Sequence, residues 1–181
     1  MATPETHELV VDERELPKVL LPQLVGRVFH VTSGSAYQEI QRLGRVETNQ
    51  AGEREFTFAF SGVSYFRRRG CVSVCDLRFL NAEAREEARL KYNFVRPTLA
   101  WQVIVFLFLG PEARQRVITW DDAVREDGLT IQGVPHLEGG HPGPIPIGDL
   151  EQVLQVQVRM DPAMEQFRRM FSAPGRLEQK Q

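Results

Sequence analysis

The sequence predicts an α+β fold with mixed, mainly antiparallel sheets of about six strands and about four helices. Three observations support this class. Several short segments alternate apolar and polar residues with the period of a strand, and others carry apolar residues at helical spacing between capping residues. These two kinds of segment do not alternate regularly, as they do in a doubly wound sheet. The 181 residues are 42% apolar and 25% charged, which is typical of a globular protein.

Size and composition indicate a single domain over residues 25–172, preceded by an extended lead-in over residues 1–24 and followed by a tail over residues 173–181. The charge is nearly balanced, with 22 basic and 24 acidic side chains, which excludes binding to nucleic acid through a large positive field. The N-terminal residues do not resemble a signal peptide, and the longest apolar stretch is shorter than the ~20 residues of a membrane helix. We therefore expect a cytoplasmic protein without membrane contact.

The first half of the domain combines strands with two helices. Alternation of apolar and polar residues predicts the first strand, and Ser35 and Gln38 have the spacing of a capping box at the start of the helix that follows. Gly44 suits the left-handed position after the last turn of that helix. The predicted elements are a strand at residues 25–31, a helix ending at Gly44, strands at residues 55–60 and 71–76, and a helix at residues 81–93.

The second half contains the most apolar segment of the chain. Residues 101–109 read WQVIVFLFL, which predicts a central strand buried on both faces. Thr119 and Gly128 are suited to cap the two ends of a helix. Eight glycines and prolines between residues 134 and 148 predict a loop. The remaining predicted elements are a short strand at residues 129–133, a strand at residues 151–160 and a helix at residues 161–171.

The two cysteines, Cys71 and Cys75, lie four residues apart in a predicted strand. Their Cα atoms would be about 13 Å apart, whereas a disulfide spans less than about 7 Å. The pair also lacks the companion ligands of a zinc site. We expect two free thiols packed on one strand face.

The first candidate for chemistry is His30, which lies in a predicted strand and is followed closely by Thr32 and the start of a helix. Such a strand end gathers a ring nitrogen, hydroxyl groups and free backbone N–H groups. The alternative is a structural histidine.

A second candidate is the segment of Ser64 and Tyr65 with the basic triplet Arg67 to Arg69. A tyrosine ring offers a stacking surface and arginine binds phosphate, so this segment would suit a nucleotide. The alternative is a solvated loop or edge strand.

The third candidate is the glycine- and proline-rich segment with His136, Glu138 and His141. These residues could approach one metal ion, but the two glycines between Glu138 and His141 would not fix their geometry. We expect no metal site. A single carboxylate aimed by the loop, or an exposed loop without a role, are the remaining alternatives.

A family resemblance connects these candidates. Residues 28–32 read VFHVT, and a short helix with Ile40 follows, ending at Leu43 and Gly44. This arrangement resembles the opening strand and helix of the ADP-ribosyltransferase superfamily, in particular poly-ADP-ribose-polymerase-like enzymes and bacterial toxins that modify DNA. The resemblance extends over residues 26–158, and its most specific part lies between residues 28 and 44. The sequence lacks the Arg and Ser-Thr-Ser motifs of the other branch, and the triplet Arg67 to Arg69 has no counterpart.

The resemblance implies an NAD site with defined roles. A histidine at the end of the first strand, here His30, holds the nicotinamide ribose, and a later tyrosine, here Tyr65, stacks on nicotinamide. A glutamate near a late strand contacts the ribose 2′-hydroxyl, and Glu138 is assigned this role, with Glu151 as the competing residue. The implied NAD contacts are His30, Thr32, Ser64, Tyr65 and Arg67, and the implied catalytic residues are Glu138, His30 and Tyr65.

We therefore expect an ADP-ribosyltransferase-like enzyme, such as a bacterial toxin or defence effector, that uses NAD as a substrate. Its acceptor would be a protein or nucleic acid that the sequence does not identify. One alternative is a non-enzymatic binding module of the same fold, with Arg67 to Arg69 on its partner surface. Another is an RNA-directed phosphotransferase-like enzyme, in which these arginines bind phosphates. The sequence leaves the oligomeric state open.

Overall fold

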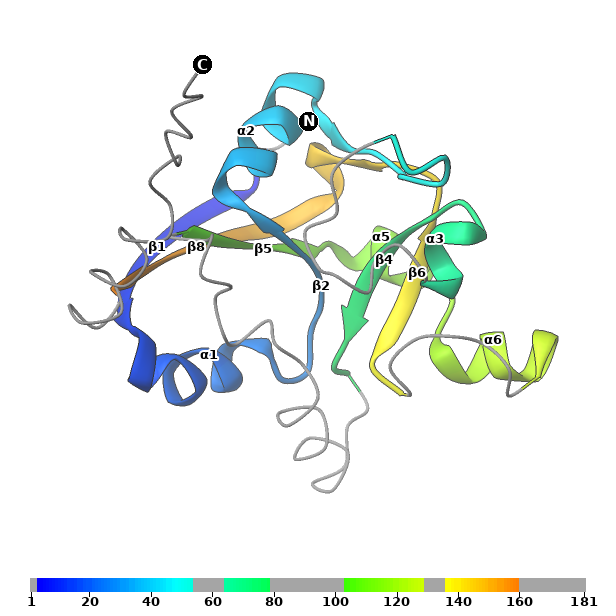
Figure 1. Cartoon of the computed structure of the whole chain (residues 1–181), viewed down its shortest axis with the longest axis horizontal. Coiled ribbons are helices and arrows are strands. Elements are labelled where there is room, and N and C mark those ends of the chain that lie inside the picture. Colours follow the sequence, from blue (N-terminus) through cyan, green and yellow to red (C-terminus); the bar gives the residue numbers. More distant parts are fainter. Residues whose placement is uncertain (1–2, 54–63, 79–102, 129–135, 160–181) are drawn as a thin grey trace, which may run out of the picture.

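A six-stranded, mainly antiparallel sheet with the strand order β1-β8-β5-β2-β4-β6 forms the centre of the structure (Figure 1). The computed structural model describes residues 3–53, 64–78, 103–128 and 136–159. The sheet consists of β1 (Glu5–Asp12), β2 (Val28–Ser33), β4 (Cys71–Asp76), β5 (Val103–Leu109), β6 (Glu138–Pro142) and β8 (Leu150–Arg159), and a second, two-stranded sheet pairs β3 (Arg45–Val46) with β7 (Ile145–Pro146). The helices are α1 (Leu16–Leu24), α2 (Gly34–Leu43), α3 (Tyr65–Arg68), α5 (Pro111–Gln115) and α6 (Trp120–Asp127), with single 3-10 turns at Glu13–Glu15 and Ile147–Asp149. The predicted α+β class is confirmed.

Strand β5 lies inside the sheet, as its apolar sequence predicts. It pairs in antiparallel fashion with β8 on one side and with β2 on the other. Successive side chains point to opposite faces of the sheet. Phe106 therefore enters one hydrophobic cluster and Leu107 the other, and both are fully buried. Both faces of the strand are buried from Ile104 onward, which accounts for its apolar sequence.

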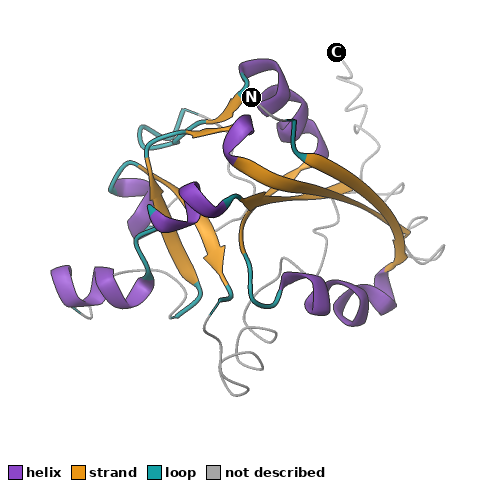
Figure 2. Ribbon diagram, turned by 180° about the vertical axis from the view of Figure 1, so that it is seen from behind, coloured by secondary structure: helices purple, strands orange, loops and turns teal. Residues whose placement is uncertain are grey.

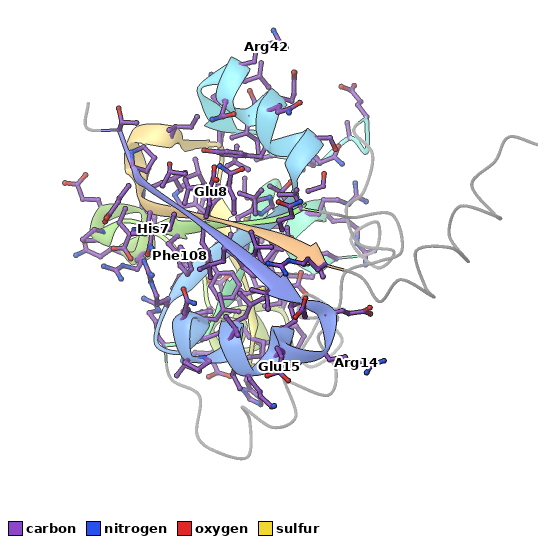
Figure 3. The ribbon with its side chains drawn as sticks, turned by 90° about the vertical axis from the view of Figure 1, so that its left-hand side faces the viewer. His7, Glu8, Arg14, Glu15, Arg42 and Phe108 are labelled. Atoms are coloured by element: carbon purple, nitrogen blue, oxygen red, sulfur yellow. The ribbon has the colours of Figure 1, made fainter. Side chains whose placement is uncertain are left out.

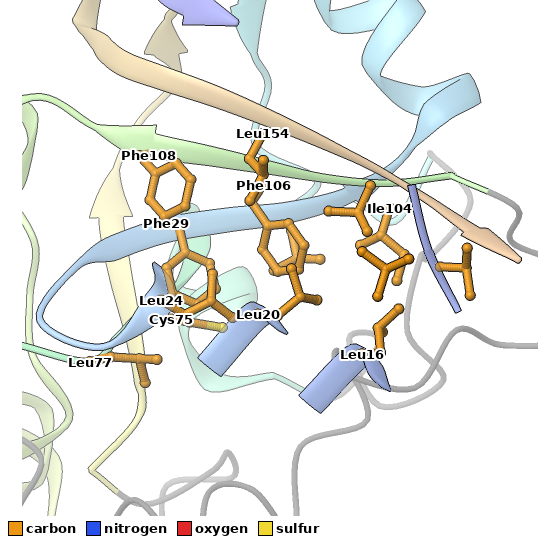
Figure 4. Close-up of a cluster of buried hydrophobic side chains, with 14 of the residues drawn as sticks. Leu16, Leu20, Leu24, Phe29, Cys75, Leu77, Ile104, Phe106, Phe108 and Leu154 are labelled. Carbon is orange, nitrogen blue, oxygen red and sulfur yellow. The ribbon is translucent and has the colours of Figure 1, made fainter. Parts of the chain in front are cut away.

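Helix α1 covers one face of the sheet (Figure 4). Its buried residues Leu16, Leu20 and Leu24 recur every four positions, so they form one apolar stripe. This stripe packs in the same cluster as Phe29, whose ring meets the rings of Phe106 and Phe108 edge-on at centroid distances of 5.7 Å. Edge-to-face contacts of this kind add to the stability gained from burial alone.

The N-terminal segment therefore differs from the expected lead-in. Residues 5–12 form β1, which pairs in parallel with β8, and residues 16–24 form α1. Pro17 lies in the first turn of α1, where its missing N–H group costs nothing, and Pro22 lies within the helix. Prolines usually argue against a helix, so the leucine spacing alone does not predict α1.

Helix α2 packs on the opposite face of the sheet through Tyr37 and Ile40 (Figure 2). Its start differs from the expected capping box at Ser35 and Gln38. The N-cap is Ser33, whose Oγ accepts a hydrogen bond from the backbone N–H group of Ala36 at 3.2 Å. The predicted end is confirmed, because Gly44 has a left-handed φ of 71°.

The glycine- and proline-rich segment forms strands β6 and β7 in place of the expected loop. Gly140 permits this because a Cβ atom at that position would lie 2.4 Å from the Phe66 ring and 2.9 Å from the Cβ atom of Cys71. Helix α3, which carries Phe66, can therefore pack directly on β4 and β6. The predicted strands at residues 55–60 and 129–133, the predicted helices at residues 81–93 and 161–171 and the predicted tail lie outside the described residues.

The predicted strand at residues 71–76 and the capped helix between Thr119 and Gly128 are confirmed as β4 and α6. Cys71 and Cys75 are both free and buried. No helix in the described ranges is long and apolar enough to cross a membrane.

His141 is a fully buried polar residue on β6. Its Nδ1 lies 3.2 Å from the carbonyl oxygen of Gly143, and since a carbonyl can only accept, Nδ1 carries the hydrogen. Its Nε2 atom is buried without a hydrogen-bond partner among the described residues. Burial lowers the pKa of His141, because a charged imidazolium would lose its hydration there.

Replacing Gly140 with alanine should destabilise the fold by about 1–3 kcal/mol, because the new methyl group would overlap the Phe66 ring. Urea unfolding followed by circular dichroism measures the loss. A Gly140→Ala/Phe66→Leu double variant should lose less than the sum of the single variants, since the smaller side chain makes room for the methyl group. An unchanged unfolding midpoint for Gly140→Ala would contradict this packing.

The free energy of unfolding should decrease as the pH is lowered below about 6.5. Below that pH the unfolded chain binds a proton at His141, whereas the folded chain keeps His141 neutral. This contribution is fully present above the unfolded-state pKa and is at most about 1.4 kcal/mol per pH unit below it. His141→Asn removes the titration and keeps a donor for Gly143, so its stability should fall less steeply between pH 7.5 and 5.5. Equal slopes for His141→Asn and the wild type would contradict the prediction.

Candidate functional site

The candidate site lies where β2 and β4 separate. Their ladder contains only the pairs Val28 with Asp76 and Phe29 with Cys75, whereas β2 with β5 and β4 with β6 pair over longer stretches. Beyond Phe29, the imidazole of His30 replaces the backbone ladder, with its Nδ1 atom 2.9 Å from the carbonyl oxygen of Ser73. The sheet is thus divided into β1-β8-β5-β2 and β4-β6, and His30 joins the two parts.

The protonation state of His30 follows from this contact. The carbonyl oxygen of Ser73 can only accept, so Nδ1 carries the hydrogen and Nε2 is left as an acceptor. Burial lowers the pKa of His30, and the hydrogen bond to Ser73 opposes this effect only in part. The imidazole is therefore neutral at physiological pH, with one acceptor nitrogen available for a hydroxyl group.

Glu138 begins β6, opposite Cys75 of β4, and its side chain is buried. Its Oε1 atom accepts a hydrogen bond from the hydroxyl of Ser64 at 2.5 Å. Ser64 is the N-cap residue of α3, yet its hydroxyl does not cap that helix. It instead lies between Glu138 and the hydroxyl of Ser73, which is 3.2 Å away.

Ser73 therefore connects the two main candidates. Its carbonyl oxygen binds His30, and its hydroxyl reaches Glu138 through Ser64. Burial and the negative charges of Glu138 and Asp76 raise the pKa of Cys75, so its thiol stays protonated beside the carboxylate. The structure thus brings together His30, Ser64 and Glu138 from three separate parts of the sequence.

Glu151, the competing carboxylate, belongs to a different cluster. Its two carboxylate oxygens lie 2.6 Å from Arg27 and 3.4 Å from Arg114. The guanidinium of Arg27 lies 3.6 Å from the centroid of the Phe108 ring, which is a cation–π contact. Glu151 is thus shared by two arginines beside β5, and neither of these ion pairs belongs to the chain of contacts from His30.

Tyr65 lies next to Ser64, but its hydroxyl is directed toward α6. It donates a hydrogen bond to Asp127 and accepts one from Arg69 at 2.6 Å. Arg69 also forms an ion pair with Glu126 at 2.5 Å. These contacts join α3 to α6, and stacking of the Tyr65 ring on nicotinamide remains a prediction.

Arg67 and Thr32 also have defined structural surroundings. The Nη1 atom of Arg67 donates to the carbonyl oxygens of Asn49 and Gln50 at 3.0 and 2.9 Å, so it holds the turn after β3. Thr32 is buried in β2 opposite Val105 of β5. Contacts of these two residues with NAD remain predictions.

His136 and His141, the histidines that accompany Glu138 in the glycine- and proline-rich segment, each contact other residues. His136 pairs with Asp121 at 3.0 Å, and His141 binds the carbonyl oxygen of Gly143. Within the described ranges, no three histidine, cysteine or carboxylate side chains lie close enough together to hold a metal ion.

Sequence reasoning missed Ser73, which joins the site. A local signal was present, since Ser73 is the polar position in the strand CVSVC and shares a face with both cysteines. Its partners lie 9 and 43 residues away in the chain, so only the strand pairing shows their proximity.

Comparisons with protein-family models, with curated proteins and with solved structures give no match for this chain.

Proposed function

We propose that this chain binds NAD where β2 and β4 separate and transfers ADP-ribose to an acceptor, as an ADP-ribosyltransferase-like enzyme. The observation that carries the proposal is the buried carboxylate of Glu138, linked through Ser64 and Ser73 to the neutral imidazole of His30. The family resemblance at the first strand predicts a histidine and a glutamate in one NAD site. The contacts between these residues support that prediction.

The carboxylate of Glu138 suits the chemistry of the nicotinamide bond. Cleavage of the bond between nicotinamide and ribose creates positive charge at the ribose C1′ atom. A carboxylate that accepts a hydrogen bond from the adjacent 2′-hydroxyl stabilises this charge most strongly in the transition state. The hydrogen bond from Ser64 fixes the position of this carboxylate before a substrate binds.

His30 suits the role of positioning the nicotinamide ribose. Its Nδ1 atom is held by Ser73, so the ring is fixed in the sheet before any ligand arrives. Its Nε2 atom can accept a hydrogen bond from a ribose hydroxyl, because the ring is neutral. Preorganisation of this kind lowers the entropy lost when the substrate binds.

Glu138→Gln should retain NAD binding and release nicotinamide roughly 10²–10³-fold more slowly, because one positioned electrostatic contact has an effect of this size. His30→Ala should instead lose most of the rise in melting temperature that NAD produces in the wild type. Thermal shift with millimolar NAD measures binding, and chromatography of released nicotinamide measures turnover.

Glu151→Gln is the matched control, since it removes the competing carboxylate. It should lower the melting temperature, because Arg27 and Arg114 lose their charged partner, and leave nicotinamide release per folded molecule unchanged. A loss of release in Glu151→Gln but not in Glu138→Gln would reverse the assignment. If NAD produces no thermal shift in the wild type, the proposed function is wrong, and binding without release would favour the non-enzymatic alternative.

A further inference from the structure

An exposed histidine–aspartate pair lies just before Glu138 in the chain. The Nδ1 atom of His136 is 3.0 Å from Oδ1 of Asp121, and the two side chains are 60% and 69% exposed. A carboxylate at Nδ1 fixes the tautomer in which Nε2 is the basic nitrogen. Among the described residues, the ring makes no other hydrogen bond, so Nε2 is open to a solute.

The backbone of His136 provides an independent observation. Its φ of 59° makes it the only residue other than glycine with a positive φ in the described parts of the chain. L-amino acids rarely adopt this conformation, which costs free energy and is concentrated at functional sites. The hydrogen bond with Asp121, in the first turn of α6, holds His136 in this conformation.

The fold places this pair near Glu138, one of the residues of the proposed NAD site. Ile118 and Gly140 exchange backbone hydrogen bonds, so the chain leading into α6 runs along the edge of β6 opposite β4. The N–H group of Asp76 in β4 donates to the carbonyl oxygen of Leu137, which fixes the residue between His136 and Glu138. His136 is exposed and lies two residues before the buried Glu138, so the pair lies close to Glu138 along the chain.

We propose that His136 is the general base that deprotonates the acceptor, with Asp121 as its positioning residue, and that the acceptor nucleophile is a neutral hydroxyl group. This inference rests on the proposed function, in which Glu138 stabilises the charge on the ribose. A hydroxyl needs a base because it must lose a proton as it bonds to carbon.

The step is balanced without a further reactant. The bond between C1′ of the ribose and the nicotinamide nitrogen breaks, and its electron pair leaves with neutral nicotinamide. The acceptor oxygen bonds to C1′, and its proton passes to Nε2 of His136. Solvent then removes this proton and restores the base.

His136→Gly is the variant that tests the inference, because glycine adopts a positive φ without strain and the backbone should keep its conformation. With water as the acceptor, nicotinamide release should fall about 10²-fold. Added imidazole should restore at least a tenth of the loss by replacing the missing base. Azide is an anion with no proton to lose, so with azide as the acceptor the variant should match the wild type.

His7→Gly is the matched control, since His7 forms a similar exposed pair with Glu5 at 3.0 Å on β1, at the outer edge of the sheet (Figure 3). It should release nicotinamide at the wild-type rate. If His136→Gly loses the same fraction of nicotinamide release with water and with azide, or does not respond to imidazole, His136 has a merely structural role and the inference is overturned. If the wild type releases nicotinamide and His136→Gly does so at the same rate, the inference fails while the proposed function stands. If the wild type neither binds nor cleaves NAD, both fail.

Discussion

The short ladder between β2 and β4 is the constraint on which the rest of the structure depends. Two residue pairs join the two parts of the sheet, and the imidazole of His30 continues the connection through the carbonyl oxygen of Ser73. A continued ladder would satisfy that carbonyl with backbone and leave no place for a side chain between the strands. The early end of the ladder therefore allows a neutral ring, two hydroxyls and a carboxylate to meet inside a sheet.

Much of the fold could be predicted because local patterns dominate it. The apolar run of β5, the alternation in β8 and the capping residues of α6 each specify their element without help from distant residues. Strand β6 could not be predicted this way, since its sequence EGGHP has almost no strand propensity. It is a strand because Gly139 and Gly140 allow Ile118 and Phe66 to approach its backbone closely, which is a tertiary effect.

The site was predictable only as a set of separate candidates. His30 and Glu138 carry chemistry that their sequence settings indicate, but their connection through Ser73 depends on the strand order. Tyr65 shows the limit most clearly. Its sequence neighbours suggest a nucleotide, whereas its hydroxyl contacts Asp127, 62 residues further along the chain. Partners at that separation are set by how helices pack on the sheet, which periodicity does not encode.

The parallel pairing of β1 with β8 has a consequence for biosynthesis. Glu5 pairs with Gln152, so the ladder of β1 cannot form until β8, one of the last described segments, has been synthesised. At a translation rate of about 5–20 residues per second, this delay is on the order of ten seconds. During that time the leucine stripe of α1 lacks part of the surface that buries it. The apolar face of α1 is thus exposed to aggregation until β8 has been synthesised.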